Sequence, residues 1–370
     1  MNNPLHIVCL DAPSLPNYGG AIDMYYKIVE LSKSRDIILH YFDYKKDRSA
    51  SGLEPFCKAI HSYKRGSLFN SLFSAKPYIV GSRINKALIA KLHEDAHPIL
   101  VEGIHCAGIL PYLQSHRKVV IRMHNDEAEY YRQLAKSESY ALKRLFHLLE
   151  SKRLNTYQQQ LKKDFPLACV SSTDMEVLKR KYNFSNLHFI PSFTSWQNLS
   201  GKEGYGKYCL YQGNLQVAEN QQMAAWLIKH VFSKIDVPFY IAGKGINKHL
   251  QSLAKPYSNV TLRNNPTDEV MNGLVKEAHI NVLPSLNNTG LKFKMLHALF
   301  QGRHCITNDA GIAGTAFSQA VHLANIPQEF IDRIQQLFKK PFTLDDLQQR
   351  TEIATVYNNK ENAAKLNALL

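Results

Sequence analysis

Short apolar runs alternate along the chain with polar, glycine-containing loops and with segments whose apolar residues recur at helical spacing. A short apolar run bounded by loop residues is typical of a buried strand, whereas apolar residues three and four positions apart are typical of a helix. In the first half of the chain this pattern predicts helices at residues 21–34, 138–163 and 173–182. It predicts strands at residues 5–10, 37–42, 56–63, 98–101, 119–123, 167–171 and 187–191.

The alternation restarts after residues 192–207, which are polar, contain glycine and show no periodicity. We interpret this stretch as a linker. Beyond it, helical patterns cover residues 268–277 and 290–300 and continue to the C-terminus. The strands predicted in this half are residues 208–211, 237–242, 260–262, 280–283, 304–307 and 320–323.

Strands that alternate with helices in this way predict parallel sheets covered by helices on both faces. The fold class is therefore α/β, and two such sets joined by a linker predict two Rossmann-like domains facing a central cleft. We expect an N-terminal domain at residues 1–192 and a C-terminal domain at residues 193–345. Ligands of such sheets bind at the carboxyl ends of the strands, so the loops after strands are where chemistry is expected.

The composition fits an ordinary globular protein, with 45% hydrophobic and 21% charged residues among 370. The apolar runs are much shorter than the roughly 20 residues of a membrane span, and no signal-peptide pattern opens the chain. The six cysteines include no C-x-x-C pair, and several lie within apolar runs. We expect a cytoplasmic protein with reduced, buried thiols and no zinc site.

The formal net charge of +14 favours a polyanionic partner: nucleic acid, an anionic membrane surface or a phosphorylated small molecule. Basic residues concentrate in residues 132–163, which contain eight of them and only two acidic residues, Glu138 and Glu150. We predict weak attachment of this stretch to the inner membrane face, the alternative being a solvated helix. Zinc-finger, RRM and KH patterns are absent, which disfavours nucleic acid as the partner.

Two loops of the first half follow predicted strands and carry candidate chemistry. Gly19 and Gly20 come after the first strand and open a helix, where glycine permits close backbone approach and the helix N-terminus favours an anion. A turn that merely needs glycine explains the same pair. His124 directly follows the strand at 119–123, so we expect it at the carboxyl edge of the sheet.

The strongest local signal is the pair Lys292 and Lys294 at the start of a predicted helix. Cations in a first helical turn oppose the helix dipole, and a bound anion would reverse that penalty. The alternative is a pair of solvated lysines. Gly243 and Gly245 resemble a dinucleotide-binding turn, but position 248 is lysine rather than the third glycine, so NAD binding is rejected.

Other catalytic motifs are missing from the sequence. It contains no D-x-D, G-x-S-x-G or Walker A pattern. These absences disfavour dedicated metal catalysis, α/β-hydrolase chemistry and P-loop phosphoryl transfer. We therefore predict no metal site and no cofactor.

Taken together, these segments resemble the GT-B glycosyltransferases, specifically the retaining family four, or group 1. The resemblance covers Gly19-Gly20, residues 120–127 and 170–174 in the first half. In the second half it covers residues 211–214, 241–243 and 281–284, the run 290–302, Thr307 and Gly311.

The resemblance implies a nucleotide-sugar donor bound mainly by the C-terminal domain and an acceptor bound mainly by the N-terminal one. It also implies that residues 346–370 cross back to the first domain. His124 would contact the transferred sugar, and Gly19-Gly20 would lie near the diphosphate. Acceptor-side contacts are expected at Asn125 and Glu127. Donor-side contacts are expected at Gly19, Gly20, Gly213, Asn214, Asn265, Thr289, Gly290, Lys292 and His297, with Lys294 as a catalytic residue.

The sequence departs from the family at two pairs of positions. The usual Glu-x7-Glu pair falls at Thr289 and His297, and the usual Arg and Lys after the first C-terminal strand fall near Asn214 and at Glu219–Asn220. Lys292 and Lys294 are thus the candidate diphosphate clamp, and His297 takes the place that normally binds the donor ribose. We predict a retaining, metal-independent transfer to a glycan or lipid-linked hydroxyl. The alternatives are an inactive sugar-nucleotide-binding subunit and a basic nucleic-acid-binding protein.

Overall fold

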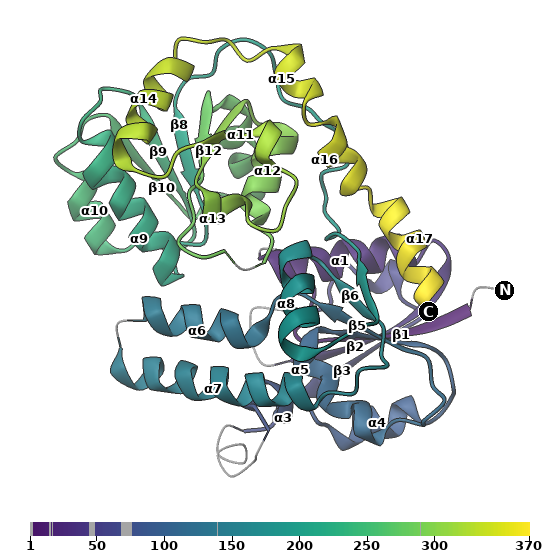
Figure 1. Ribbon diagram of the computed structural model, residues 1–370. Coiled ribbons are helices and arrows are strands. Elements are labelled where there is room, and N and C mark those ends of the chain that lie inside the picture. The colour runs from purple at the N-terminus through teal and green to yellow at the C-terminus, as the bar shows by residue number, and fades with distance from the viewer. Residues whose placement is uncertain are drawn as a thin grey trace. The chain divides into compact units, whose positions relative to one another are not determined.

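The computed structural model describes residues 3–14, 16, 18–43, 49–67, 76–138, 140–288 and 290–370. The chain divides by its packing into two units, which we describe separately (Figure 1). The N-terminal unit comprises residues 1–195, 289–291 and 357–370, and the C-terminal unit comprises residues 196–288 and 292–356. The division at 195/196 lies three residues from the predicted boundary, and the return to the N-terminal unit occurs at residue 357 rather than 346.

The N-terminal unit is built on a parallel sheet of seven strands in the order β3-β2-β1-β4-β5-β6-β7. The order reverses direction between β1 and β4, as in a Rossmann-like sheet. Each strand overlaps a predicted apolar run. Their bounds are β1 Asn3–Cys9, β2 Arg35–Asp43, β3 Ala59–Lys64, β4 Ile99–Glu102, β5 Val119–Met123, β6 Leu167–Cys169 and β7 Leu187–Phe189.

Helices cover both faces of this sheet. Successive residues of a strand point to opposite faces, so a single strand packs against both helical layers. On one face Ile7 of β1 packs with Met24 of α1 (Gly19–Leu31) and with Leu366 of α17 (Asn359–Leu369). On the other face Val8 packs with helices that include α4 and α7. The remaining helices of the unit are α3 Tyr78–Gly81, α4 Lys86–Leu92, α5 Gly103–Cys106, α6 Glu127–Ser137, α7 Ala141–Gln160 and α8 Ser172–Tyr182, with 3-10 turns at Glu54–Phe56 and Ala107–Tyr112.

The helix predicted at residues 138–163 is α7, which begins at Ala141 and ends at Gln160. The preceding helix α6 was not predicted, and Glu138 after it is extended with φ −83° and ψ 126°. Asp126 starts α6, since its side chain accepts a hydrogen bond from the Ala128 N–H. The predicted strand at 56–63 is also too early, because residues 54–56 form a 3-10 turn before β3.

The C-terminal unit repeats the architecture with six parallel strands in the order β10-β9-β8-β11-β12-β13. Here the order reverses between β8 and β11. The strands are β8 Cys209–Gln212, β9 Phe239–Gly243, β10 Val260–Asn264, β11 Ile280–Val282, β12 His304–Thr307 and β13 His322–Leu323. The helices are α9 Ala218–Leu227 with a π-helical turn at Ile228–Phe232, α10 Lys248–Ala254, α11 Asp268–Glu277, α12 Phe293–Gln301, α13 Asp309–Ile312, a 3-10 turn at Ser318–Ala320, α14 Pro327–Leu337, α15 Leu344–Gln348 and α16 Thr351–Val356.

All six cysteines are unpaired thiols, and every one except the half-buried Cys57 is buried, as the apolar runs predicted. Among the described residues, no helix combines the length and the apolar character needed to cross a membrane.

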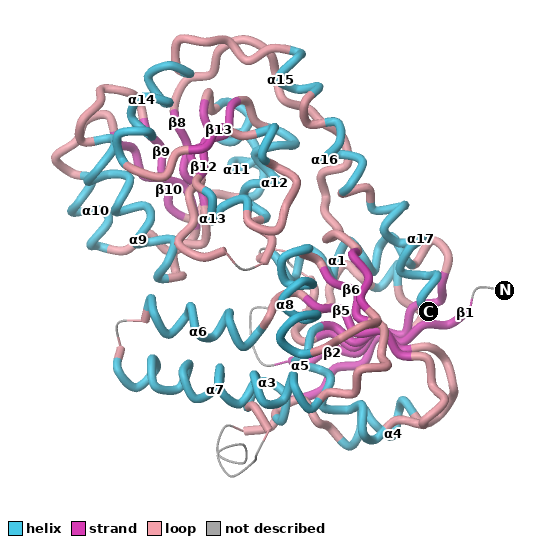
Figure 2. Tube along the Cα trace, viewed as in Figure 1, coloured by secondary structure: helices cyan, strands magenta, loops and turns pink. Residues whose placement is uncertain are grey.

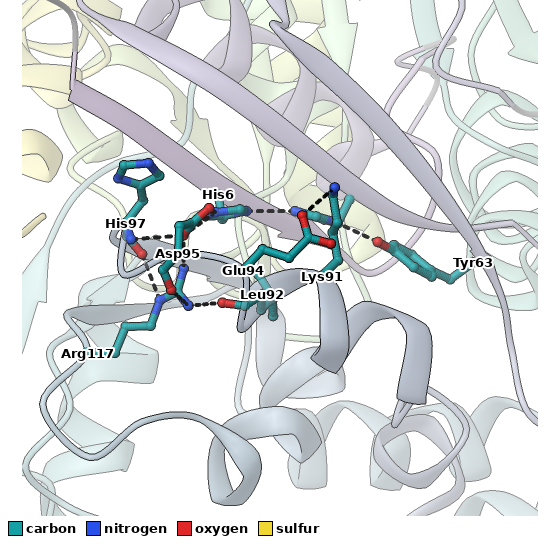
Figure 3. Close-up of polar contacts among 9 residues, drawn as sticks. His6, Tyr63, Lys91, Leu92, Glu94, Asp95, His97 and Arg117 are labelled. Carbon is teal, nitrogen blue, oxygen red and sulfur yellow. Dashed lines mark hydrogen bonds and ion pairs between the residues drawn. The ribbon is translucent and has the colours of Figure 1, made fainter.

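A chain of hydrogen-bonded polar side chains crosses the face of the N-terminal sheet that carries α4 (Figure 3). Asp95 accepts hydrogen bonds from Arg117 at 2.8 Å and from His6 at 3.1 Å. His6 Nδ1 lies 2.8 Å from His40 Nε2, and His40 Nδ1 lies 3.0 Å from the Tyr63 hydroxyl. Because a carboxylate only accepts, the bonds run in one direction, from Tyr63 through His40 and His6 to Asp95. Burial lowers the pKa of His6, and it lowers the pKa of His40 to about 2.

This cluster predicts acid sensitivity. The unfolded chain protonates His40 near its ordinary pKa of 6.5, whereas the folded protein keeps it neutral down to a pKa of about 2. The contribution of His40 to the free energy of unfolding is therefore constant above pH 6.5. Below pH 6.5 it falls by about 1.4 kcal/mol per pH unit. Urea unfolding of wild type and His40→Gln at several pH values between 6.5 and 4.5 checks this. The slope of the unfolding free energy against pH should be smaller in His40→Gln, by the amount that corresponds to about one proton taken up on unfolding. An equal slope in the two proteins would show that His40 has the same pKa in the folded and the unfolded chain.

Candidate functional site

In each unit the point where the strand order reverses is the expected ligand position. In the N-terminal unit the ends of β1 and β4 border this point; β4 ends at Glu102, and the adjacent strand β5 is followed by His124. In the C-terminal unit the loop after β8 and the segment between β11 and α12 border it. Several of the site residues predicted from the sequence lie on these loops, whereas Asn265 follows β10 and His297 lies within α12.

A network of four buried charged side chains lies beneath His124. Asp23 of α1 accepts from Lys27 at 2.7 Å and from Arg122 at 2.9 Å. Lys27 also contacts Glu102 at 2.8 Å. All four side chains are fully buried. Two carboxylates and two cations thus balance in a region without solvent, where an uncompensated charge would be costly.

The network keeps both of its carboxyl groups ionised. Burial alone would raise the pKa of Asp23, but Arg122 and Lys27 hold it well below its usual range. Burial also acts to raise the pKa of Glu102, and Lys27 together with the hydrogen bond from His124 reverses this and lowers it.

The network fixes the His124 ring. His124 Nε2 lies 3.0 Å from the Glu102 carboxylate, so that nitrogen carries a hydrogen and donates it. Nδ1 lies 3.9 Å from Asp23. The side chain is 11% exposed. The sequence placed His124 at a strand end, and the structure shows in addition that the ring is oriented by Glu102.

Asp23, Glu102 and His124 also have the residue types of a metal site, with ligand atoms within 4.8 Å of one another. Lys27 and Arg122, however, already neutralise both carboxylates. A divalent cation would add two charges to a buried cluster that is balanced without it. This trio does not fit a metal.

The predicted acceptor-side residues are brought together beside His124. The Asn125 amide donates to the Glu127 carboxylate at 3.1 Å. Burial raises the pKa of Glu127 to about 7, which leaves the group close to half protonated at neutral pH. Gly290 belongs to the same unit and has φ +64°, and a Cβ there would overlap the Asn125 side chain. Glycine is therefore required at 290.

In the C-terminal unit, Lys294 lies in the first turn of α12 and is half-buried. Its Nζ is 3.2 Å from Asn220 Oδ1 and 3.3 Å from the Tyr211 hydroxyl, and it lies 4.7 Å from the centroid of the Tyr211 ring. Burial lowers the pKa of Lys294 to about 8, although the negative charge of Glu219 acts to raise it. Lys294 is thus cationic at neutral pH without a direct carboxylate partner among these contacts.

Lys292 flanks Lys294 at the N-cap of α12. Its Nζ donates to Asn287 Oδ1 at 3.0 Å. In the described part of the chain, the N-cap residue makes no side-chain capping bond to this helix, and its first turn contains no acid. Glu219 holds the preceding loop, accepting from the Ser285 hydroxyl at 3.1 Å and the Leu286 N–H at 3.2 Å. Two cations beside an uncapped helix N-terminus form a geometry suited to an anion.

Three other predicted donor residues form turns after β8 and β10. Gly213 follows β8, and a Cβ there would lie 3.3 Å from the Asn220 side chain. Asn214 accepts from the Gln216 N–H at 3.0 Å. Asn265 adopts φ +51° and accepts from the Gly245 N–H at 3.0 Å, which closes the turn at Gly243–Gly245. Contacts of these residues with a donor stay predictions.

His297 is buried in α12 and stacks face to face on Trp196, with centroids 4.5 Å apart and planes 9° apart. Burial lowers the pKa of His297 to about 4. Its Nε2 has no hydrogen-bond partner in the described part of the chain. The covering Trp196 is a feature that the sequence did not indicate.

The remaining predicted donor residues are Gly19, Gly20 and Thr289. The helix α1 begins at Gly19, two residues before the predicted start, and a Cβ at Gly20 would lie 3.1 Å from the Tyr18 ring. Thr289 lies outside the described residues.

Comparison with known proteins agrees with this arrangement. The family described as Glycosyl transferases group 1 matches residues 206–340. A protein of Klebsiella pneumoniae, described as an uncharacterized 44.6 kDa protein in the cps region, is 25% identical over 342 residues, which is 86% of each chain.

Two solved structures share the fold at low sequence identity. Sucrose-phosphate synthase from Thermosynechococcus elongatus has a TM-score of 0.65 at 13% identity and covers 100% of this chain and 96% of its own. A variant of S. aureus TarM in complex with Fondaparinux, alpha-GlcNAc-glycerol and UDP has a TM-score of 0.65 at 11% identity. The match covers 100% of this chain and 99% of the TarM chain.

Proposed function

Because the chain is a group 1 glycosyltransferase with the GT-B fold, which acts on a nucleotide sugar, we propose that it retains the configuration of that sugar and needs no metal ion. The observation that carries the proposal is the pair Lys292 and Lys294 at the uncapped N-terminus of α12. These groups and the helix amides would bind the donor diphosphate.

The bond between the sugar C1 and the diphosphate oxygen breaks in this reaction, and a bond from C1 to the acceptor oxygen forms. Negative charge builds up on the departing diphosphate. Lys294 is cationic and held in place by Asn220 and Tyr211, so it can stabilise that charge without reorganisation. For retention by attack on the front face, a phosphate oxygen of the leaving group takes the proton of the acceptor hydroxyl.

We assign His124 to positioning the transferred sugar. The ring is oriented by Glu102, and the side chain is 11% exposed. Asn125 and Glu127 follow it on the same loop and would face the acceptor. The acceptor is a hydroxyl of a glycan or a lipid-linked sugar, which the location of the K. pneumoniae relative in a cps region supports.

A second candidate is an inactive subunit that binds the nucleotide sugar without transferring it. Glu219 stands at a position where the family usually has a basic residue, and its carboxylate accepts hydrogen bonds from the loop before α12. Trp196 covers His297, where the ribose would bind.

His124→Ala separates binding from transfer. We expect turnover to fall on the order of 10²-fold because the sugar is no longer aligned. Calorimetry with the free nucleoside diphosphate should give an unchanged affinity, since the lysines of α12 remain. The exposed His116→Ala serves as the matched control and should alter neither value. Loss of nucleotide affinity in His124→Ala would contradict the positioning role.

Chelation tests the metal-independent step. The buried carboxylates Asp23 and Glu102 are engaged by Lys27 and Arg122, and Lys294 can supply the charge that a divalent ion would otherwise provide. We therefore expect the initial rate to be unchanged in excess EDTA. A rate abolished by EDTA and restored by added Mg²⁺ or Mn²⁺ would overturn the lysine-based account.

A further inference from the structure

The helix α7 exposes a row of leucines to solvent. Its large side chains Leu142, Leu145, Leu148 and Leu149 are 84%, 54%, 45% and 52% exposed. Tyr140, just before the helix, is 69% exposed. Large apolar side chains that gather in this way on one helix are a recognised sign of an interaction surface.

These leucines share one face of the helix. Leu142, Leu145 and Leu149 are three and four positions apart, which places them one above another on a helix. The opposite face, with Glu150, Leu154 and Gln158 at spacings of four, is buried in the N-terminal unit. The hydroxyl of Ser151 bonds to the Ala128 carbonyl of α6 at 2.7 Å, and α6 runs beside α7 (Figure 1 and Figure 2). The leucine face therefore points away from its own unit.

Basic residues accompany the leucines. Lys143, Arg144 and Lys152 are exposed, and Arg153 is half-buried. The single acid of α7 is Glu150, which is buried and accepts a hydrogen bond from the Ile79 N–H at 2.8 Å. The exposed part of α7 thus presents apolar side chains together with positive charge and no negative charge.

We propose that this face of α7, which we call the leucine face, docks in the interfacial layer of an anionic lipid bilayer. The leucines would enter the boundary between headgroups and acyl chains, and the basic residues would meet the anionic headgroups. A second copy of the chain is a poor occupant, because a symmetric contact would bring the same basic residues together. The inference rests on this helix alone and is independent of the sugar-transfer chemistry.

Sedimentation of the full chain with vesicles tests the proposal. We expect binding to vesicles containing an anionic lipid such as phosphatidylglycerol and little binding to pure phosphatidylcholine. Binding should weaken in about 0.5 M NaCl, where charges are screened within a few ångströms. Equal recovery with both vesicle types, or no recovery with either, would overturn the proposal.

Two variants and their controls locate the surface. Leu145→Ser/Leu149→Ser should weaken vesicle binding at least tenfold, whereas Leu344→Ser, which removes an equally exposed leucine of the C-terminal unit, should not. Replacing Lys143, Arg144 and Lys152 by glutamine should weaken it on the order of 10²-fold, since each cation near such a surface contributes about fivefold.

The matched charge control replaces the exposed Lys234, Lys248 and Lys255 of the C-terminal unit by glutamine, which removes the same charge and should have a much smaller effect. Circular dichroism checks that every variant is folded. If the two triple variants lose binding equally, net charge rather than the leucine face is responsible. If Leu145→Ser/Leu149→Ser instead dissolves a dimer seen by sedimentation equilibrium and leaves vesicle binding unchanged, the face is an interface between copies. Either result overturns the proposal.

Discussion

Lys294→Ala is expected to lower kcat/KM on the order of 10²-fold or more, the usual effect of removing one preorganised charge from a site that stabilises a developing anion. Among the described residues, the amine contacts only uncharged groups at hydrogen-bond distance, Asn220 and Tyr211, so its charge remains available to a ligand. Steady-state kinetics with the preferred donor measures the effect.

The matched control is Lys292→Ala, which should cost less because Lys292 flanks the helix and donates to Asn287. The pH profile is a second readout. The pKa of Lys294 is lowered by burial to about 8, so kcat/KM of the wild type should fall as pH rises past that value. A variant with near-normal kcat/KM would place the diphosphate elsewhere.

Asp23→Asn is expected to lower the free energy of unfolding by about 3–5 kcal/mol, the scale for breaking a buried ion pair on one side. Asp23 accepts from Lys27, from Arg122 and from the Phe193 N–H at 2.8 Å. With an amide at this position, the buried Arg122 would lose its carboxylate partner, and the buried Lys27 would keep only Glu102.

Urea unfolding measures this loss, with Asp36→Asn as the control. Asp36 forms a partly exposed pair with Lys58 at 3.4 Å, and its loss should cost about 0–1 kcal/mol. A similar small cost for Asp23→Asn would mean that the network is not needed for stability, and that His124 is oriented by Glu102 alone.

The strands could be predicted from the sequence because parallel, doubly covered sheets require continuous apolar runs, and few other elements produce them. Helix α6 was missed for a local reason. Its start depends on the cap at Asp126, which stands beside His124 in a segment that looked like a loop.

The buried network beneath His124 was not predicted from the sequence. Asp23 and Lys27 are four apart, a spacing that equally fits a surface ion pair, and only the fold brings Arg122 to them. The one signal was Arg122 itself, a charge inside the apolar strand at 119–123. The neighbours of Lys294 are similarly nonlocal, since Tyr211 and Asn220 lie more than 70 positions away.

The central claim is that the chain transfers a sugar from a nucleotide-sugar donor. The most direct test incubates the protein with a panel of UDP-, GDP- and ADP-sugars and measures release of the nucleoside diphosphate, with and without a glycan or lipid-linked acceptor. We predict release that depends on one donor, increases with acceptor and is lost in Lys294→Ala. Binding of a nucleotide sugar without any release would identify an inactive subunit, and affinity only for polynucleotide with a steep salt dependence would identify a nucleic-acid-binding protein; both results would contradict the account.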